Sequence, residues 1–483
     1  MYLGLDLGTS GLKGMLIDEA QNVIASKNAE IDGARPHDGW SEQDPADWIA
    51  ACEAVMDALV ADHPTEMAAL KGIGLSGHMH GATILDADDK PLRPCILWND
   101  TRSHKEAAEL DAQPIFRAVS GNIVFPGFTA PKLLWVKNNE PDIFAKVAMV
   151  LLPKDYLRLW LSGEHISEMS DSAGTSWLDV GKRDWSDELL TATGLTRAQM
   201  PKLVEGSEVG GHLRDDLAAR WNLSKNIVIA GGAGDNAASA IGMGTVKAGQ
   251  AFVSLGTSGV VFAANDSYLP KPESAVHAFC HALPNKWHQM GVILAATDGL
   301  NWYSRITGKS PQELTAELGE LEAPGATLFL PYLGGERTPH NDATIRGAFL
   351  NLSHTDDRAA LTRAVLEGVA FALRDNLEAL KSAGTNIDRM LAVGGGSLSK
   401  YWLEVIATAM NLPIDVPKDG DFGAAFGAAR LGLLAATGKD PETVCTGPEI
   451  DHTIQPNAAL VPAFADAYQS YKQAYPALKG ATK

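Results

Sequence analysis

The chain has 483 residues, which is too long for one ordinary hydrophobic core, so two large domains are expected. Hydrophobic residues make up 45 % of it and charged residues 20 %, the balance of a soluble globular protein, and its apolar runs are too short to span a membrane. The formal net charge of −19 repels phosphate backbones and argues against nucleic acid as a partner. A nucleotide site would therefore depend on local backbone N–H groups and a metal ion.

The N-terminus and the cysteines favour a cytoplasmic protein. Met1 to Asp6 contains neither a basic segment nor a cleavage site, which predicts no secretion signal. The cysteines are scattered without a C-x-x-C pair, so free thiols in a reducing compartment fit better than disulfides or a zinc site. They are Cys52, Cys95, Cys280 and Cys445.

A pentapeptide near the N-terminus occurs again halfway along the chain. Leu7-Gly8-Thr9-Ser10-Gly11 returns as Leu255-Gly256-Thr257-Ser258-Gly259. Each copy lies between two short apolar runs, a pattern typical of a β-hairpin. We therefore expect two similar halves that each open with a Gly-rich hairpin. A cluster of glycines over 242–249 predicts the boundary, with domains at 1–244 and 245–483.

Strands alternate with helices through the rest of the chain, which predicts an α/β fold. In chain order, the expected strands are 73–75 with a hairpin partner at 82–85, then 227–230 and 390–393. The expected helices are 237–241, 361–380, 401–410 with Ser399 as its N-cap, and 423–436.

The first hairpin has the residues of a phosphate and metal site. Gly8 and Gly11 allow a tight turn whose N–H groups, with the Thr9 and Ser10 hydroxyls, suit phosphate oxygens. Asp6 is expected to hold Mg²⁺ through water, and Lys13 to supply a cation to the phosphates. In the second copy Ser254 replaces the aspartate, and its Gly256 and Thr257 would bind phosphate only. An ordinary hairpin turn is the alternative in both cases.

Three other Gly-rich segments carry candidate residues. Asp235 follows Gly231-Gly-Ala-Gly234 before a helix, where it is a candidate general base or a simple N-cap. Gly394, Gly395 and Gly396 end a strand and could receive adenine, or form a plain turn. In the turn around His80, a polyol contact is favoured over incidental histidines. Metal binding by His78 and His80 is disfavoured because the sequence places no third ligand, and His277, His281 and His288 are too loosely spaced to favour a metal site.

Longer stretches of the chain resemble the FGGY carbohydrate kinases, and among them the bacterial xylulokinases. The resemblance runs almost from end to end and is carried by 1–13, 40–45, 77–81, 97–100, 126–132, 152–157, 230–236, 331–340 and 393–397. It implies two actin-like (ribonuclease H-like) domains with a nucleotide and sugar cleft between them. It also implies ATP-dependent phosphorylation of D-xylulose to D-xylulose 5-phosphate in pentose catabolism, with ATP and Mg²⁺.

The resemblance also implies roles for individual residues. Asp235 would accept the proton, Asp6 would serve the metal, and Met79 and His80 would contact the sugar. Gly8 to Gly11, Gly256 and Thr257 would bind phosphate, and Gly394 to Gly396 would bind adenosine. The remaining positions that would line the sugar pocket are Trp98, Asn99, Asp100 and Asn236. His78 stands where glutamine is usual and is expected to tune affinity only.

Two alternatives remain open. One is a sister kinase of the same fold that acts on another ketose or polyol. The other is a non-catabolic actin-like ATPase, disfavoured because the two halves use the whole chain and leave no room for a client-binding domain. The oligomeric state, a homodimer included, is left open by the sequence.

Overall fold

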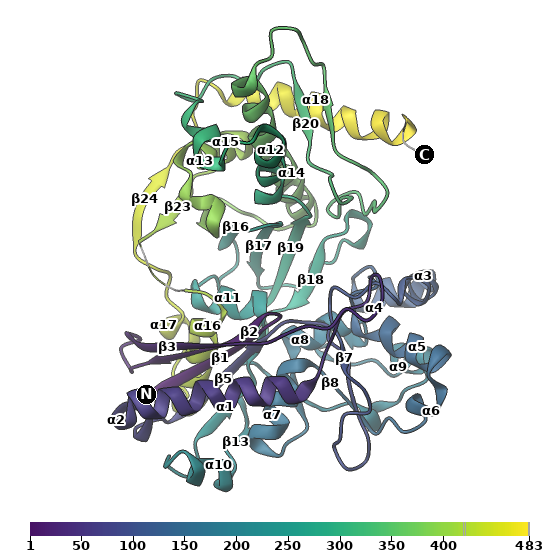
Figure 1. Ribbon diagram of the computed structural model, residues 1–483, viewed down its shortest axis with the longest axis vertical. Coiled ribbons are helices and arrows are strands. Elements are labelled where there is room, and N and C mark those ends of the chain that lie inside the picture. Colours follow the sequence, from purple (N-terminus) through teal and green to yellow (C-terminus); the bar gives the residue numbers. More distant parts are fainter. Residues whose placement is uncertain (419, 421, 482–483) are drawn as a thin grey trace.

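Two seven-stranded sheets organise the computed structural model, which describes residues 1–418, 420 and 422–481. They form the cores of two α/β bodies (Figure 1). The N-terminal half, from purple to teal, lies below, and most of the C-terminal half, from teal to yellow, lies above. The two-domain α/β fold expected from the sequence is confirmed. Among the described residues, no helix has the combined length and apolarity needed to cross a membrane.

The first sheet contains the first glycine hairpin at its centre. Its strands run in the order β13 (Val209–His212), β14 (Val228–Ala230), β5 (Gly72–Gly77), β1 (Tyr2–Gly8), β2 (Gly11–Ile17) and β3 (Val23–Glu30), with the short β15 (Ala233–Gly234) also paired to β5. β1 is antiparallel to β2, with Gly8 opposite Gly11 across the turn, and parallel to β5.

The second sheet repeats this plan. Its order is β18 (His277–Cys280), β19 (Trp287–Ile293), β17 (Gly259–Asn265), β16 (Ala251–Leu255), β22 (Met390–Val393), β23 (Ile414–Pro417) and β24 (Ile450–Ile454). β16 is antiparallel to β17 and parallel to β22, as β1 is to β2 and β5. The repeated pentapeptide therefore marks the same turn in two sheets of matching order, with β18 as an additional edge strand.

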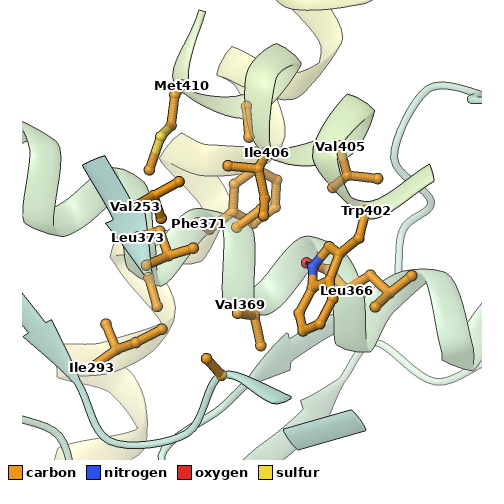
Figure 2. Close-up of a cluster of buried hydrophobic side chains, with 14 of the residues drawn as sticks. Val253, Ile293, Leu366, Val369, Phe371, Leu373, Trp402, Val405, Ile406 and Met410 are labelled. Carbon is orange, nitrogen blue, oxygen red and sulfur yellow. Dashed lines mark hydrogen bonds between the residues drawn. The ribbon is translucent and has the colours of Figure 1, made fainter. Parts of the chain in front are cut away.

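Helices cover the faces of both sheets. In the first half, α1 (Pro45–Asp62) packs on β2 and β3. In the second, α14 (Arg358–Ser382) and α15 (Lys400–Met410) bury a core against β16 and β19. Figure 2 shows Phe371 and Ile406 at its centre, with Val253 on one side and Trp402 on the other. The Ser399 hydroxyl accepts from the Trp402 N–H and caps α15, as predicted.

One helix lies on the sheet of the other half. α16 (Ala424–Thr437) belongs to the second half of the sequence but packs on β1, β5 and α11 (Asp235–Gly242) of the first, as Figure 1 also shows. Glycines permit this approach: a Cβ on Gly74 would lie 1.7 Å from the Ala428 carbonyl oxygen, and one on Gly427 would lie 1.8 Å from that of Ala238. The boundary near 242–249 stays a prediction, and the chain crosses back to the first domain after it.

Most predicted elements occur with small shifts of their ends. The exception is 82–85, expected as the hairpin partner of 73–75: β6 (Thr83–Leu85) instead pairs with β8 (Met149–Leu151) in a separate small sheet. The remaining helices are α2 (Pro64–Ala68), α3 (His104–Asp111), α4 (Pro114–Ser120), α5 (Thr129–Asn139), α6 (Pro141–Phe144), α7 (Pro153–Ser162), α8 (Met169–Ser172), α9 (Asp187–Thr193), α10 (Asp215–Arg220), α12 (Thr297–Thr307), α13 (Pro311–Ala316), α17 (Pro441–Val444) and α18 (Val461–Ala481). The remaining strands are β4 (Glu42–Gln43), β7 (Cys95–Ile96), β9 (Ile166–Glu168), β10 (Leu178–Asp179), β11 (Asp184–Trp185), β12 (Lys202–Val204), β20 (Leu328–Leu330) and β21 (Ala348–Leu350).

Candidate active site

Asp235 is the first residue of α11, directly after β15. Its Oδ1 accepts hydrogen bonds from the Asn236 backbone N–H (2.7 Å) and side-chain Nδ2 (2.9 Å). Within the described residues its Oδ2 has no hydrogen-bond partner, which leaves that oxygen for a ligand. The N-cap of α11 is Gly234 and no side chain caps it, so Asp235 does not serve as the cap. Burial, and then the charge of Asp6, raises the pKa of Asp235 to about 6.

The glycine segment before Asp235 is anchored on a buried ionic cluster. Arg158 donates to the carbonyls of Ala230 (2.7 Å) and Gly231 and contacts the Asp155 carboxylate at 3.5 Å. Lys154 beside it pairs with Asp155 and with two further buried carboxylates, those of Glu168 and Asp171. This arrangement fixes the path of a segment that glycines would otherwise leave loose.

His80 occupies a strained turn that faces the same region. Its φ of 71° is left-handed, which is costly for a residue with a Cβ. Its carbonyl accepts from the Lys132 ammonium (2.9 Å) and the Thr129 hydroxyl (3.1 Å), which hold the turn. Lys132 also donates to Gly127 at 2.7 Å and is fully buried, and burial lowers its pKa to about 7.

The contacts of the His80 ring define its protonation. Nδ1 lies 2.7 Å from the Gly174 carbonyl oxygen, which can only accept, so Nδ1 carries the hydrogen. Burial lowers the pKa of His80 to about 3, and the neutral ring therefore presents Nε2 as a hydrogen-bond acceptor. An acceptor in this position suits a donating hydroxyl group.

Met79 connects this turn to the candidate base. A Cβ on Gly234 would lie 2.9 Å from Met79 Cγ, so the turn at Met79 and His80 is in contact with the residue before Asp235. His78 points elsewhere: it is buried and its ring meets the edge of Trp48 at 6.0 Å. In the described part of the chain, no group of three or more His, Cys, Asp or Glu side chains could hold a metal.

The side chains of the loop 97–100 make different kinds of contact. Trp98 is 47 % exposed and its Nε1 donates to Thr9 Oγ1 at 3.0 Å, which joins this loop to the first hairpin. Asn99 is partly exposed, and its Oδ1 has no partner among the described residues. Asp100 is buried in an ion pair with Arg102 and accepts from the Ser41 N–H, so its carboxylate holds the loop.

The first hairpin opens onto a cavity of about 560 Å³. Its lining includes Asp6, Gly8, Ser10, Gly11 and Lys13. Asp6 lies opposite Lys13 in the β1–β2 ladder. The carboxylates of Glu30 and Asp32 line the same cavity. The Asp6 carboxylate beside backbone donors fits Mg²⁺, which keeps most of its water and takes other oxygens from a bound polyphosphate.

The segment 394–396 lies beside two further cavities, and the strand before the second hairpin reaches one of them through Ser254. The Gly256 carbonyl accepts from the N–H and hydroxyl of Thr297, and the Thr257 carbonyl accepts from the Ala296 N–H, which fixes the turn against the start of α12. A cavity of about 560 Å³ includes Gly395 and Gly396 in its wall, with Tyr401 and Trp402. A second one, of about 420 Å³, brings Asn236, Ser254 and Gly394 together.

Sequence reasoning missed Lys132 and Arg158. Both lie in or next to stretches that carried the family resemblance, 126–132 and 152–157, but no local pattern showed which carbonyls they hold. Lys132 reaches a carbonyl 52 residues away and Arg158 one 72 residues away.

Comparison with known proteins agrees with this geometry. The FGGY family of carbohydrate kinases matches over both halves, its N-terminal domain at residues 1–242 and its C-terminal domain at 251–436. A xylulose kinase of Escherichia coli (strain K12) is 49 % identical over 90 % of each chain.

Solved structures extend the match. A "xyloylose kinase" from Brucella ovis is 68 % identical over 99 % of both chains, with a TM-score of 0.98. A xylulose kinase from Rhodospirillum rubrum is 26 % identical over 99 % of both chains, with a TM-score of 0.93. With two matching hairpins, a half-buried carboxylate at a helix start and matches over both halves, the chain belongs to the FGGY family of carbohydrate kinases.

Proposed function

We propose that the chain transfers the γ-phosphoryl group of ATP to the 5-hydroxyl of D-xylulose, with Asp235 as proton acceptor. The observation that carries this proposal is the position of Asp235, whose Oδ2 faces no partner in the described structure while its neighbour Gly234 contacts the Met79–His80 turn. The relatives that match nearly the whole chain are xylulose kinases, which supports the choice of sugar.

Phosphoryl transfer depends mainly on positioning and charge neutralisation. Asp235 would orient the attacking hydroxyl and take its proton as the O–P bond forms. A pKa of about 6 keeps this carboxylate ionised at neutral pH and makes it a stronger base than an ordinary aspartate. Mg²⁺, held near Asp6, would neutralise the polyphosphate charge. The donors of the two hairpins, at 8–11 and 256–257, would bind the phosphate oxygens.

The sugar would lie between the base and the His80 turn. Nε2 of His80 would accept a hydrogen bond from one sugar hydroxyl. Trp98, Asn99 and Asn236 stay predicted pocket residues. We propose that Asp100 does not contact the sugar itself but holds the loop that carries Trp98 and Asn99, because its carboxylate is already bonded to Arg102 and Ser41. Adenosine would enter the cavity beside Gly395 and Gly396.

Two further expectations belong to this proposal. Cys52, Cys95, Cys280 and Cys445 are all free and buried, which supports a reducing, cytoplasmic setting. A homodimer is the assembly to test against a monomer by light scattering.

The experiment is a coupled ADP-release assay over a panel of pentuloses and polyols with the wild type and Asp235→Asn. We expect D-xylulose to give the highest kcat/KM, and the variant to lose turnover by about 10²- to 10⁴-fold while it still binds the sugar. If glycerol or another ketose is the best substrate, the assignment of D-xylulose is wrong. If Asp235→Asn keeps normal turnover, the assignment of Asp235 as proton acceptor is wrong.

A further inference from the structure

Arg337 lies on the loop between β20 and β21 of the second half, and its side chain reaches the first half. Its guanidinium lies 4.6 Å from the ring centre of Phe125, which belongs to the segment between α4 and α5. Its Nη1 lies 3.5 Å from Nε2 of His277 on β18. Arg337 therefore stands where the two halves of the molecule meet.

Arg337 forms no ion pair with a carboxylate of the described residues, although the charge of Glu336 acts on it. Within the described residues, no Asp or Glu oxygen lies within ion-pair distance of its guanidinium. The neighbouring Glu336 is buried, and its Oε1 accepts instead from the backbone N–H groups of Leu294 (3.1 Å) and Arg337 (2.8 Å). A guanidinium has five N–H donors, and burial lowers the pKa of this one. Most of its hydrogen-bonding capacity is therefore left for a ligand.

The loop that carries Arg337 is held rigidly. Thr338 donates from its N–H to the Val292 carbonyl (3.0 Å) and from its hydroxyl to the Ala275 carbonyl (2.9 Å). His340 stacks on Tyr475 of α18 at 3.6 Å between ring centres. A side chain on such a support is preorganised for binding rather than free to sample many positions.

A line of contacts places Arg337 at the far end of the sugar region from the base. Asp235 follows Gly234, which touches Met79, and the next residue, His80, stacks on Phe128 with ring centres 4.4 Å apart. Phe128 in turn lies 5.8 Å from the ring of His277, the neighbour of Arg337. The electrostatics agree with this order, because the charge of Arg337 acts on His80 whereas the charge that acts on Asp235 is that of Asp6.

We propose that Arg337 is a substrate-binding residue of the second half, which donates hydrogen bonds to the oxygens at C1 and C2 of the open-chain ketose. This inference rests on the proposed function, which puts the reacting 5-hydroxyl at Asp235 and so turns the other end of the sugar toward Arg337. A ketone oxygen only accepts hydrogen bonds, and a guanidinium only donates them, so the two groups are complementary. The sugar then contacts both halves of the molecule.

The test combines variants of Arg337 with sugars altered at one end. Arg337→Gln should lower kcat/KM for D-xylulose by about 10- to 100-fold, mainly through KM, with less than a twofold change in the KM for ATP. The same assay is run with 1-deoxy-D-xylulose and with xylitol, in which the C2 ketone is an alcohol. For at least one of these two sugars, the kcat/KM of the wild type should be about tenfold or more below its kcat/KM for D-xylulose. In Arg337→Gln the corresponding decrease should be small, because the guanidinium that donates to the altered oxygen is already absent.

Arg346→Gln is the matched control, since Arg346 is an exposed arginine of the same loop that bonds to the Ala343 and Ile345 carbonyls. Arg346→Gln should leave the kcat/KM for D-xylulose, the KM for ATP and the decrease caused by each altered sugar as they are in the wild type. Arg337→Lys keeps the charge and serves if the glutamine variant folds poorly, with the same comparison of sugars. If each altered sugar lowers kcat/KM by the same factor in the wild type and in either Arg337 variant, Arg337 has a purely structural role and the proposal is overturned. Failure of the wild type to phosphorylate D-xylulose would instead overturn the proposed function.

Discussion

Replacing Gly427 by alanine tests whether the packing of α16 holds the catalytic helix in place. The added Cβ would lie 1.8 Å from the Ala238 carbonyl oxygen and 2.9 Å from the Gly242 nitrogen, both in α11. Contacts below 3.0 Å essentially do not occur, so the two helices must separate by at least about 1.2 Å. Because α11 begins at Asp235, the base would move with it.

Two opposing effects set the size of the change. Alanine gains about 1 kcal/mol over glycine in a helix interior, whereas overpacking against backbone costs about 3 kcal/mol. The overpacking is larger, so we expect a net destabilisation of about 2 kcal/mol and a melting temperature about 4–8 °C lower. A shift of the base by about 1 Å should also reduce kcat by about 10²-fold.

Calorimetry and the ADP-release assay measure both effects on the same sample. Gly480→Ala is the matched control, because Gly480 lies in α18 with no atom within 4 Å of its added Cβ. It should change the melting temperature by less than a degree or two and leave kcat intact. A Gly427→Ala enzyme as stable and as active as this control would refute the argument that the close contact positions Asp235.

Three other predictions follow from the site. The kcat/KM of the wild type should fall about tenfold per pH unit below about pH 6, because protonated Asp235 cannot accept a proton; a flat profile down to pH 4.5 would contradict this. Lys132→Met should raise the KM for the sugar by about tenfold and leave that for ATP unchanged, because the His80 carbonyl loses its ammonium donor; equal changes in both would point to a general loss of structure. Asp6→Ala should lower turnover about 10²-fold or more with an unchanged fold by circular dichroism, and near-normal activity at ordinary Mg²⁺ would remove its metal role.

The parts of the fold that the sequence predicted are those encoded locally. The repeated pentapeptide located both hairpins, because a turn between two apolar runs is specified by adjacent residues. The pairing of strands that lie far apart in the chain was harder to predict from the sequence. The strand at 83–85 has three residues, and nothing in so short a run selects its distant partner at 149–151 over the strand beside it in the sequence.

The site follows the same division. Asp235 was recognisable because four small residues precede it, a pattern that capping alone does not require. The contribution of Lys132 depends on a carbonyl contact between residues 52 positions apart, and that of Arg337 on a contact across the two halves. A lone basic residue in a sequence gives no sign of the partner it will find. Asp100 was assigned to the pocket on resemblance, whereas its carboxylate pairs with Arg102 two residues later.

The return of α16 to the first sheet bears on how the chain is made. Ribosomes add about 5–20 residues per second, so the helix at 424–437 appears about 10–40 s after residue 242. During that interval the glycine-lined face of β1 and β5 has no cover, and its flat backbone surface is open to other chains. A fragment that stops at residue 242 should therefore aggregate. Adding a peptide of residues 424–437 should restore it to solution, as the missing piece of its own domain.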